Sequence, residues 1–285
     1  MSGVPSTVGV IGGGRMGAGI AQVFAQAGSE VIVIERDADA AEQAQSRLAT
    51  GVAKAAERNP SVRAENVLAR TRVSTEFAAL AGSVLVIEAV PEIHALKVDA
   101  LARAEAFIDD TSWLTTNTSS LSITRLSDAL QRPERFCGLH FFNPVPPSAL
   151  VEVVLTEHTL PELRENATEW VQALSKTAVV VNDAPGFASS RLGLALALEA
   201  MRMIEEDVAS AEDIDAAMVL GYRHATGPLR TSDLVGLDVR LGIAEYLHET
   251  LGERFAPPQI LRDKVAAGEL GRKTGRGFFD YPAGS

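Results

Sequence analysis

The sequence lacks what a disulfide scaffold, a cysteine metal centre or a nucleic-acid surface requires. Its 285 residues include one cysteine, Cys137, so no disulfide framework or cysteine zinc site can form within the chain. Lysine and arginine number 26 against 37 aspartates and glutamates, a formal net charge of -11 that argues against a nucleic-acid partner. A lone cysteine also favours a reducing cytoplasmic location.

Features of membrane proteins are absent as well. No uncharged apolar run reaches the ~18 residues that span a bilayer, and residues 1–7 lack the pattern of a signal peptide, so no membrane association is expected. With 46% hydrophobic residues and mixed charges, the chain is expected to be globular, with one large domain or two ordinary ones. No clustered His, Cys or Asp spacing suggests a metal site.

A glycine motif follows an apolar strand predicted over 8–11. It reads Gly12-Gly13-Gly14-Arg15-Met16-Gly17 and leads into an alanine-rich helix that ends at Gly28. A second strand is predicted over 31–34, and Glu35 ends it about 20 residues after the motif. This context predicts a dinucleotide site on the helix N-terminus, with structural glycines as the alternative. The contacts predicted in the motif are Gly12, Gly14, Arg15, Met16 and Gly17.

Two charged residues after the second strand bear on the choice of dinucleotide. Glu35 can accept hydrogen bonds from the adenosine ribose hydroxyls and would repel a 2′-phosphate, so NAD is predicted over NADP. Arg36, next to it, weakens that preference. A long helix is then predicted over 37–57. Lys54 on it is a candidate for a distant substrate phosphate, with solvated surface charge as the alternative.

Polar residues follow two further strands. Glu92 comes after an apolar strand predicted over 84–90, and Lys97 lies on the helix that begins near His94. Residues just past the carboxyl end of a parallel strand face the ligand edge of such a sheet. Glu92 and Lys97 are therefore predicted beside the cofactor, with helix capping or surface exposure as the alternative.

A cluster of small polar groups follows the strand predicted over 113–116. It begins with Asn117-Thr118-Ser119-Ser120, on the same expected edge of the sheet. Such groups either cap the next helix or place a hydroxyl against a substrate oxygen. We predict Asn117 on the cofactor side and Ser119 on the substrate side.

The chemistry is expected in the stretch Gly138–Val153, which reads GLHFFNPVPPSALVEV. Strands are predicted over 135–139 and 150–155, and the prolines between them exclude a helix. This strand–turn–strand pattern brings Glu152 beside His140. A carboxylate next to an imidazole fixes its tautomer and suits it to act as a general base, whereas a purely structural His–Glu pair is the alternative.

Together these motifs resemble the L-3-hydroxyacyl-CoA dehydrogenases, including the short-chain 3-hydroxybutyryl-CoA enzymes. The resemblance rests on the glycine motif, on NTSSLSI at 117–123, on GLHFFNPVP at 138–146 with LVEV behind it, and on GRKTGRGFFDY at 271–281. It covers nearly the whole chain. It implies reversible, NAD-dependent oxidation of a short-chain L-3-hydroxyacyl-CoA to the 3-ketoacyl-CoA.

The resemblance also implies roles for particular residues. It makes His140 the general base and Glu152 its partner, and it places Ser119 at the substrate's 3-oxygen. Asn143 is a further substrate contact, and Ser190 falls where the family has an asparagine that binds the substrate carbonyl. Glu92 and Lys97 fall on positions that the family uses near the cofactor.

The second part of the chain is expected to be helical. A last strand is predicted over 179–181, and a break follows at Asn182-Asp183-Ala184-Pro185-Gly186. We expect a Rossmann-type α/β domain over 1–183 and an all-α substrate and dimerisation domain over 184–285. Helices are predicted over 187–206, 210–220 and 234–251, with one more after Pro258. In the family this domain forms a dimer interface, so a homodimer is expected.

Four residues at three places depart from the family pattern. Ser190 replaces the usual asparagine of Pro-Gly-Phe-x-x-Asn-Arg, and Ser148-Ala149 replaces a common Met-Lys. Thr226 stands where an apolar residue is usual near the acyl chain. These departures keep open a different 3-hydroxy substrate, such as an acyl group on a carrier protein or a sugar acid. A dinucleotide-binding protein without catalysis is a third possibility, against which Ser119, His140 and Glu152 argue.

Overall fold

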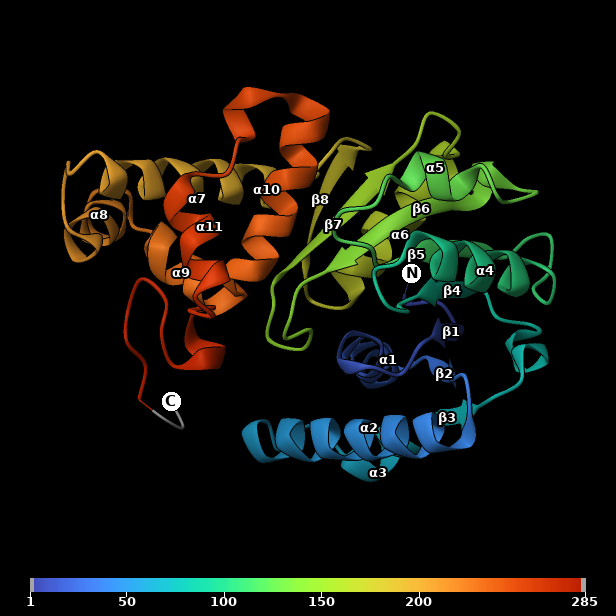
Figure 1. Ribbon diagram of the computed structural model, residues 1–285. Helices are drawn as coiled ribbons and strands as arrows, with labels where there is room; N and C mark the ends of the chain where they lie inside the picture. Colours follow the sequence, from blue (N-terminus) through green and yellow to red (C-terminus); the bar gives the residue numbers. More distant parts are fainter. Residues whose placement is uncertain (1–2, 283–285) are drawn as a thin grey trace. The chain divides into compact units, whose positions relative to one another are not determined.

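The computed structural model describes residues 3–282, and the chain divides into two compact units, residues 1–184 and 185–285. The first unit holds a single sheet with helices packed on it, and the second is built from helices (Figure 1). The predicted Rossmann-type sheet followed by an all-α part is confirmed.

Eight strands form the sheet in the order β3-β2-β1-β4-β5-β6-β7-β8. Strands β1 to β6 run parallel to one another, whereas β7 pairs antiparallel with β6 and parallel with β8. The carboxyl ends of six strands therefore meet at one edge, where ligands bind in open α/β sheets. The strands are β1 Thr7–Ile11, β2 Glu30–Ile34, β3 Thr71–Ser74, β4 Leu85–Glu88, β5 Trp113–Thr116, β6 Phe136–Phe141, β7 Leu150–Leu155 and β8 Thr177–Asn182.

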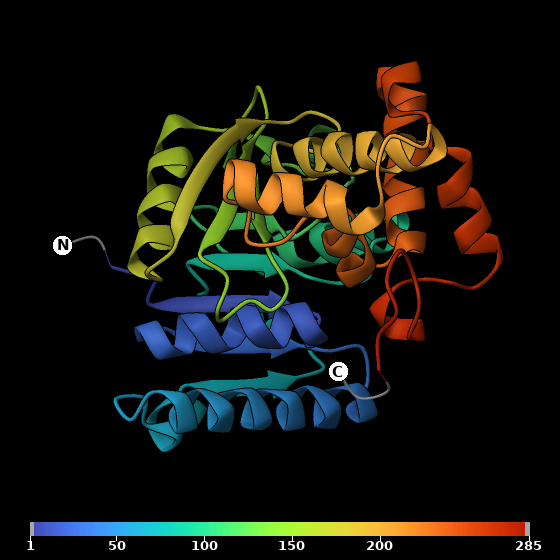
Figure 2. The same ribbon diagram turned by 90° about the vertical axis from the view of Figure 1, so that its left-hand side faces the viewer.

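Helices cover both faces of the sheet because its strands are apolar on both sides. One face packs against α1, α2, α3 and α6, with Val8, Val10 and Ile87 in the shared core. Figure 2 shows α1 and α2 side by side along that face. The helices are α1 Arg15–Ala27, α2 Ala38–Arg58, α3 Ala64–Ala69, α4 His94–Glu105, α5 Ile123–Ser127 and α6 Pro161–Ala173, with 3-10 turns η1 Phe77–Leu80 and η2 Pro133–Arg135.

On the opposite face, α5 packs against the sheet at Gly138, which has no side chain. A Cβ at Gly138 would lie 3.0 Å from Ile123 Cδ1, while Cys137 and Leu139 point to the other face. Gly138 thus lets α5 approach β6 closely, two residues before His140. Cys137 is fully buried, and burial raises the pKa of its thiol to about 12, so it is an inert core residue.

The second unit has its own core, formed by Leu194, Leu198, Met201, Leu237 and Leu247 among others. Its helices are α7 Ser189–Glu205, α8 Ala211–Ala216, α9 Pro228–Val235, α10 Leu237–Leu251 and α11 Gln259–Ala266, with a π turn η3 Ala217–Gly221 and 3-10 turns η4 Glu253–Phe255 and η5 Arg272–Thr274. No helix within residues 3–282 is both long enough and apolar enough to cross a bilayer.

Several predicted elements differ from the observed ones. The helix predicted over 234–251 is two helices, α9 and α10, because Gly236 has φ +108° and breaks the chain direction. The strand predicted over 84–90 ends at Glu88, whose Oε1 accepts a hydrogen bond from Val90 N at 2.6 Å. Helix α6 was not predicted. It begins at Pro161, a favourable first helical residue.

A buried aspartate holds the tail of the second unit. Asp233 accepts hydrogen bonds from Phe278 N and Phe279 N at 2.9 Å and from the Tyr281 hydroxyl at 3.1 Å. Burial, together with the negative charge of Asp233, raises the pKa of Tyr281 to about 12. The Gly-Phe-Phe-Asp-Tyr segment is therefore held in place by hydrogen bonds to the buried carboxylate of Asp233.

Removing this carboxylate should destabilise the second unit. For Asp233→Ala we expect the free energy of unfolding to fall by about 2–4 kcal/mol, because three donors lose a buried charged acceptor. The measurement is urea unfolding beside Asp280→Ala, whose side chain is 88% exposed and should cost less than about 0.5 kcal/mol. An equal decrease in the free energy of unfolding of both variants would contradict the role of Asp233 in holding this segment.

Candidate active site

The predicted histidine–glutamate contact is confirmed by the β6–β7 hairpin. Strand pairing places His140 directly opposite Glu152, and His140 Nδ1 lies 2.8 Å from Glu152 Oε2. The side chains are 5% and 0% exposed. An ionised carboxylate can only accept, so Nδ1 carries the proton and donates it, which leaves Nε2 as the unprotonated nitrogen. The Phe142 ring lies 4.4 Å from the imidazole, centroid to centroid.

Two contacts hold the hairpin in this position. Asn117 Oδ1 accepts a hydrogen bond from Phe141 N at 2.8 Å, which ties the end of β5 to the residue after His140. Lys176 Nζ donates to the Val145 and Ser148 carbonyl oxygens at 2.8 and 2.5 Å. Burial lowers the pKa of Lys176. Sequence reasoning missed Lys176, because nothing in its neighbourhood distinguishes it from a surface lysine.

The glycine turn has the shape that a pyrophosphate requires. Gly12 has φ +93°, and a Cβ there would lie 2.9 Å from the Ala89 carbonyl oxygen. A Cβ on Gly17 would collide with the Gly12 carbonyl oxygen. A Cβ at Gly14 would meet no atom within 4 Å, so the backbone is open there, and no side chain caps the start of α1. The turn and the helix N-terminus therefore fit a phosphate group.

Glu35 lies against the glycine turn, as its position after β2 suggests. Its Oε1 accepts from Gly13 N at 2.7 Å, while Arg36 turns away to pair with Asp37 at 3.0 Å. Arg47, which sequence reasoning missed, lies 3.4 Å from the Gly13 carbonyl oxygen through Nη1. Arg15 is exposed and Met16 packs on the core beneath. Glu35, Arg47 and Arg15 therefore carry charge beside the turn.

Glu92 is the centre of a hydrogen-bond cluster at the ends of β4 and β5. Its Oε1 accepts from the Thr118 hydroxyl at 2.5 Å and from Ser119 N and Ser120 N at 2.9 and 3.0 Å. Burial alone would raise the pKa of Glu92. The Lys97 charge, together with these hydrogen bonds, outweighs burial, so the pKa is lowered. Glu92 thus holds the loop that carries Ser119.

Lys97 is buried rather than displayed to solvent. Its side chain is 1% exposed, and Nζ lies 2.8 Å from Glu88 Oε1 and 3.4 Å from Glu92 Oε2. Thr116 donates to the other oxygen of Glu88 at 2.5 Å. Sequence reasoning missed Glu88, the last residue of β4. The surface alternative for Lys97 is therefore wrong, and the lysine positions Glu92 by charge.

The remaining predicted site residues are scattered. Ser119 and Asn143 are exposed at the ends of β5 and β6, and Ser190 is half-buried in the first turn of α7 in the second unit. Lys54 is exposed on α2, and among the described residues no contact joins it to another predicted site residue. No group of three or more His, Cys, Asp or Glu side chains in residues 3–282 is placed to hold a metal ion.

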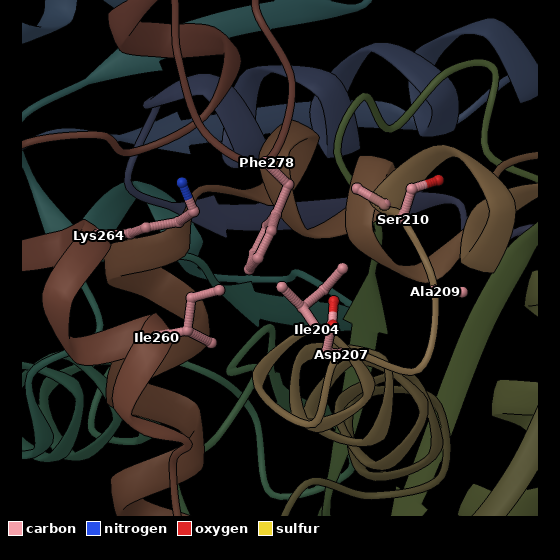
Figure 3. A pocket seen from close by; sticks show the side chains of 8 residues that line it. Ile204, Asp207, Ala209, Ser210, Ile260, Lys264 and Phe278 are labelled. Atoms are coloured by element: carbon pink, nitrogen blue, oxygen red, sulfur yellow. The ribbon is translucent and has the colours of Figure 1, made fainter.

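A hollow on the second unit is lined by other residues. Figure 3 shows a hollow of about 470 Å³ lined by Ile204, Asp207, Ala209, Ser210, Ala211, Ile260, Lys264 and Phe278. None of these is a predicted site residue. Lys264 is already engaged by Glu269 at 2.9 Å and by the Gly277 carbonyl oxygen at 2.8 Å.

The sheet, its glycine turn and the acid after β2 define a dinucleotide-binding domain. Residues 7–184 match the family model described as 3-hydroxyacyl-CoA dehydrogenase, NAD binding domain, and residues 186–281 match the C-terminal domain of the same family. The chain belongs to the 3-hydroxyacyl-CoA dehydrogenase family.

Individual relatives agree over nearly their whole lengths. A probable 3-hydroxybutyryl-CoA dehydrogenase of Deinococcus radiodurans is 40% identical, over 96% of this chain and 99% of that protein. The 3-hydroxybutyryl-CoA dehydrogenase of Mycobacterium tuberculosis is 39% identical, over 99% of this chain and 100% of that protein. The solved (S)-3-hydroxybutyryl-CoA dehydrogenase of Ralstonia eutropha is 35% identical with a TM-score of 0.92, covering 97% and 99% of the two chains.

The lowered pKa of Glu92 predicts how its contribution to stability depends on pH. The folded pKa lies below the ordinary 4.5, so the ionised carboxylate stabilises the fold above about pH 4.5 and loses this effect as pH falls through the folded value. In urea unfolding, the free energy of unfolding of Glu92→Gln should be lower than that of wild type by a constant amount near neutral pH. The difference between the two should become smaller in acid. Glu42→Gln, at an exposed position on α2, is the control and should show no such trend. A gap that widens in acid would contradict the assignment.

Proposed function

We propose that the protein oxidises an L-3-hydroxyacyl-CoA, of short chain, to the 3-ketoacyl-CoA in a reversible, NAD-dependent reaction. The observation that carries this proposal is the buried His140–Glu152 pair at the end of β6, on the same sheet edge as the glycine turn. Membership of the family and the names of its relatives support the substrate class.

The cofactor site fits NAD. The open backbone at Gly14 and the uncapped start of α1 would hold the pyrophosphate, and the carboxylate of Glu35 would hold the adenosine ribose. Gly12, Arg15, Met16 and Gly17 form the rest of the turn, and Arg36, Glu92, Lys97 and Asn117 are further members of the proposed site. NAD held by these residues would supply the hydride acceptor for carbon 3 of the substrate.

His140 is the proposed general base. With Nδ1–H donated to Glu152, its Nε2 would take the proton of the substrate's 3-hydroxyl. Glu152 would then stabilise the imidazolium that forms. In the reverse direction the imidazolium returns the proton to the 3-keto oxygen. The carboxylate keeps the ring from rotating, because it is itself enclosed by β6 and β8.

Other residues are proposed to hold the substrate. The exposed hydroxyl of Ser119 would donate to the 3-oxygen while Glu92 holds its backbone. Ser190 would steady the carbonyl in place of the family's asparagine, and Asn143 and Lys54 are further substrate contacts, the last for a phosphate of CoA. We infer that residues 1–183 form the NAD-binding domain and that residues 184–285 form a substrate and dimerisation domain.

The second unit also supports a homodimer. Leucine and valine side chains are exposed on α7, α9 and α10, among them Leu192 at 67% and Val239 at 45%. An apolar surface of this kind is typical of subunit contacts, and we propose that a second copy covers it. We propose a cytoplasmic location, supported by the single, buried cysteine.

Replacing the general base should abolish most of the activity. We expect His140→Gln to lower kcat for acetoacetyl-CoA reduction by ~100-fold or more while NADH still binds, because proton transfer loses its acceptor. The assay is NADH oxidation followed by absorbance. His158→Gln, at a 49% exposed position of the same unit, is the control and should retain wild-type turnover. A fully active His140→Gln would refute the assignment of the base.

Glu35 should set the choice between NAD and NADP. Gln at this position can still accept from Gly13 N, but it no longer repels a 2′-phosphate. We expect the preference for NAD, measured as the ratio of kcat/KM values, to fall by about tenfold or more in Glu35→Gln. Glu30→Gln, at the opposite end of β2, should leave the ratio unchanged. An unchanged ratio in Glu35→Gln would remove Glu35 from the cofactor site.

A further inference from the structure

A carboxylate lies at each end of the loop that follows β5, residues 117–122. Glu92 lies at its start, and all the hydrogen bonds that it receives from the loop meet at one atom, Oε1. At the other end, Asp183 Oδ2 accepts from the Ser122 hydroxyl at 2.8 Å and from Thr124 N at 2.9 Å. The loop is therefore attached to the rest of the first unit at two separate points.

The loop has four side-chain hydroxyls, and three of them hold the loop itself. Those of Thr118 and Ser120 donate to Glu92 at 2.5 and 3.1 Å, and that of Ser122 donates to the second carboxylate. Within residues 3–282 the hydroxyl of Ser119 has no hydrogen-bond partner, and its side chain is exposed. The loop thus presents one hydroxyl that remains available to a ligand.

Asp183 is placed by the sheet rather than by the loop. It follows β8 directly, and its N–H donates to the Leu155 carbonyl oxygen at 2.8 Å, which extends the β7–β8 pairing by one residue. In the described part of the chain its carboxylate forms no ion pair with a lysine or an arginine. Its hydrogen bonds instead go to a segment about 60 residues earlier in the sequence. Asp183 therefore links an ordered strand to the loop.

A single point of attachment would not fix the direction of the Ser119 hydroxyl. Glu92 binds Ser119 N and its neighbours through one oxygen atom, so the segment could rotate about that atom. The bonds to Asp183 lie three and five residues further along the chain and oppose this rotation. Hydrogen bonds to a carboxylate are roughly twice as strong as those between neutral groups, so the second attachment is firm.

We propose that Asp183 is a positioning residue for the reaction, which sets where the Ser119 hydroxyl lies. The inference rests on the proposed function, in which this hydroxyl donates to the substrate's 3-oxygen. Such a donor must meet the oxygen at hydrogen-bond distance, and a displacement of about 1 Å can lower the rate by about 100-fold. Without Asp183 the hydroxyl keeps its chemistry and loses its place.

The first experiment measures acetoacetyl-CoA reduction by variants of Asp183. We expect kcat to fall by about tenfold or more in Asp183→Ala, with the dissociation constant of NADH unchanged. An asparagine still accepts both hydrogen bonds through its amide oxygen, so Asp183→Asn should stay within about threefold of wild type. Asp128→Ala, at an exposed aspartate that ends α5, is the matched control and should keep wild-type turnover.

A double-mutant cycle with Ser119→Ala separates positioning from a purely structural role as a cap of α5. If Asp183 acts through Ser119, Asp183→Ala should lower kcat by less than about twofold in the Ser119→Ala background, because the hydroxyl that it places is already absent. A cap that only stabilises α5 would lower kcat by the same factor in both backgrounds. That result, or a wild-type kcat in Asp183→Ala alone, overturns the proposal.

Hydrogen–deuterium exchange tests the attachment without turnover. In Asp183→Ala the amides of residues 118–124 should exchange about tenfold faster than in wild type, while those of β1 keep their wild-type rate. If wild type reduces no 3-ketoacyl thioester, the proposed function fails, and the exchange still shows whether Asp183 holds the loop. Unchanged exchange over residues 118–124 overturns the proposal in either case.

Discussion

The structure of the site depends on one hydrogen bond between two buried side chains, from the His140 imidazole to the Glu152 carboxylate. A carboxylate enclosed by neighbouring strands is stable only when a donor meets it, and β6–β7 pairing brings the imidazole directly opposite. A shift of the hairpin by one residue would turn both side chains to the other face of the sheet. Gly138, Asn117 and Lys176 are explained by this requirement, because each fixes the position of the hairpin.

The same principle recurs across the sheet edge. The buried pair of Glu88 and Lys97, together with the partly exposed Glu92, forms a chain of alternating charges that ends at the loop bearing Ser119. Such a chain holds a loop more firmly than packing alone, because an unpaired member would be costly. Arg240 in the second unit is the exception: it is buried, charged and unpaired among the described residues.

Much of the fold and part of the site were predictable from local pattern. The strands β5 and β7 lie where strands are predicted over 113–116 and 150–155, and α8 begins beside its cap Ser210, within the helix predicted over 210–220. The prediction of one helix from Leu234 was wrong. The chain breaks at Gly236 because of a positive φ, which hydrophobic periodicity does not reveal. Helix α6 was missed between two strands. Arg47, Glu88 and Lys176 were missed because their partners are distant in sequence.

Local sequence determined the glycine turn, the proline-rich hairpin loop and the order of strands and helices, since each follows from backbone preference and apolar spacing. It also supplied the residues that identify the family. Tertiary structure alone decided which charges meet: that Lys97 is buried against Glu88, that Glu35 binds the turn, and that Arg240 meets no carboxylate. The physical reason is that pairing depends on distances between elements far apart in the chain, which no local pattern encodes.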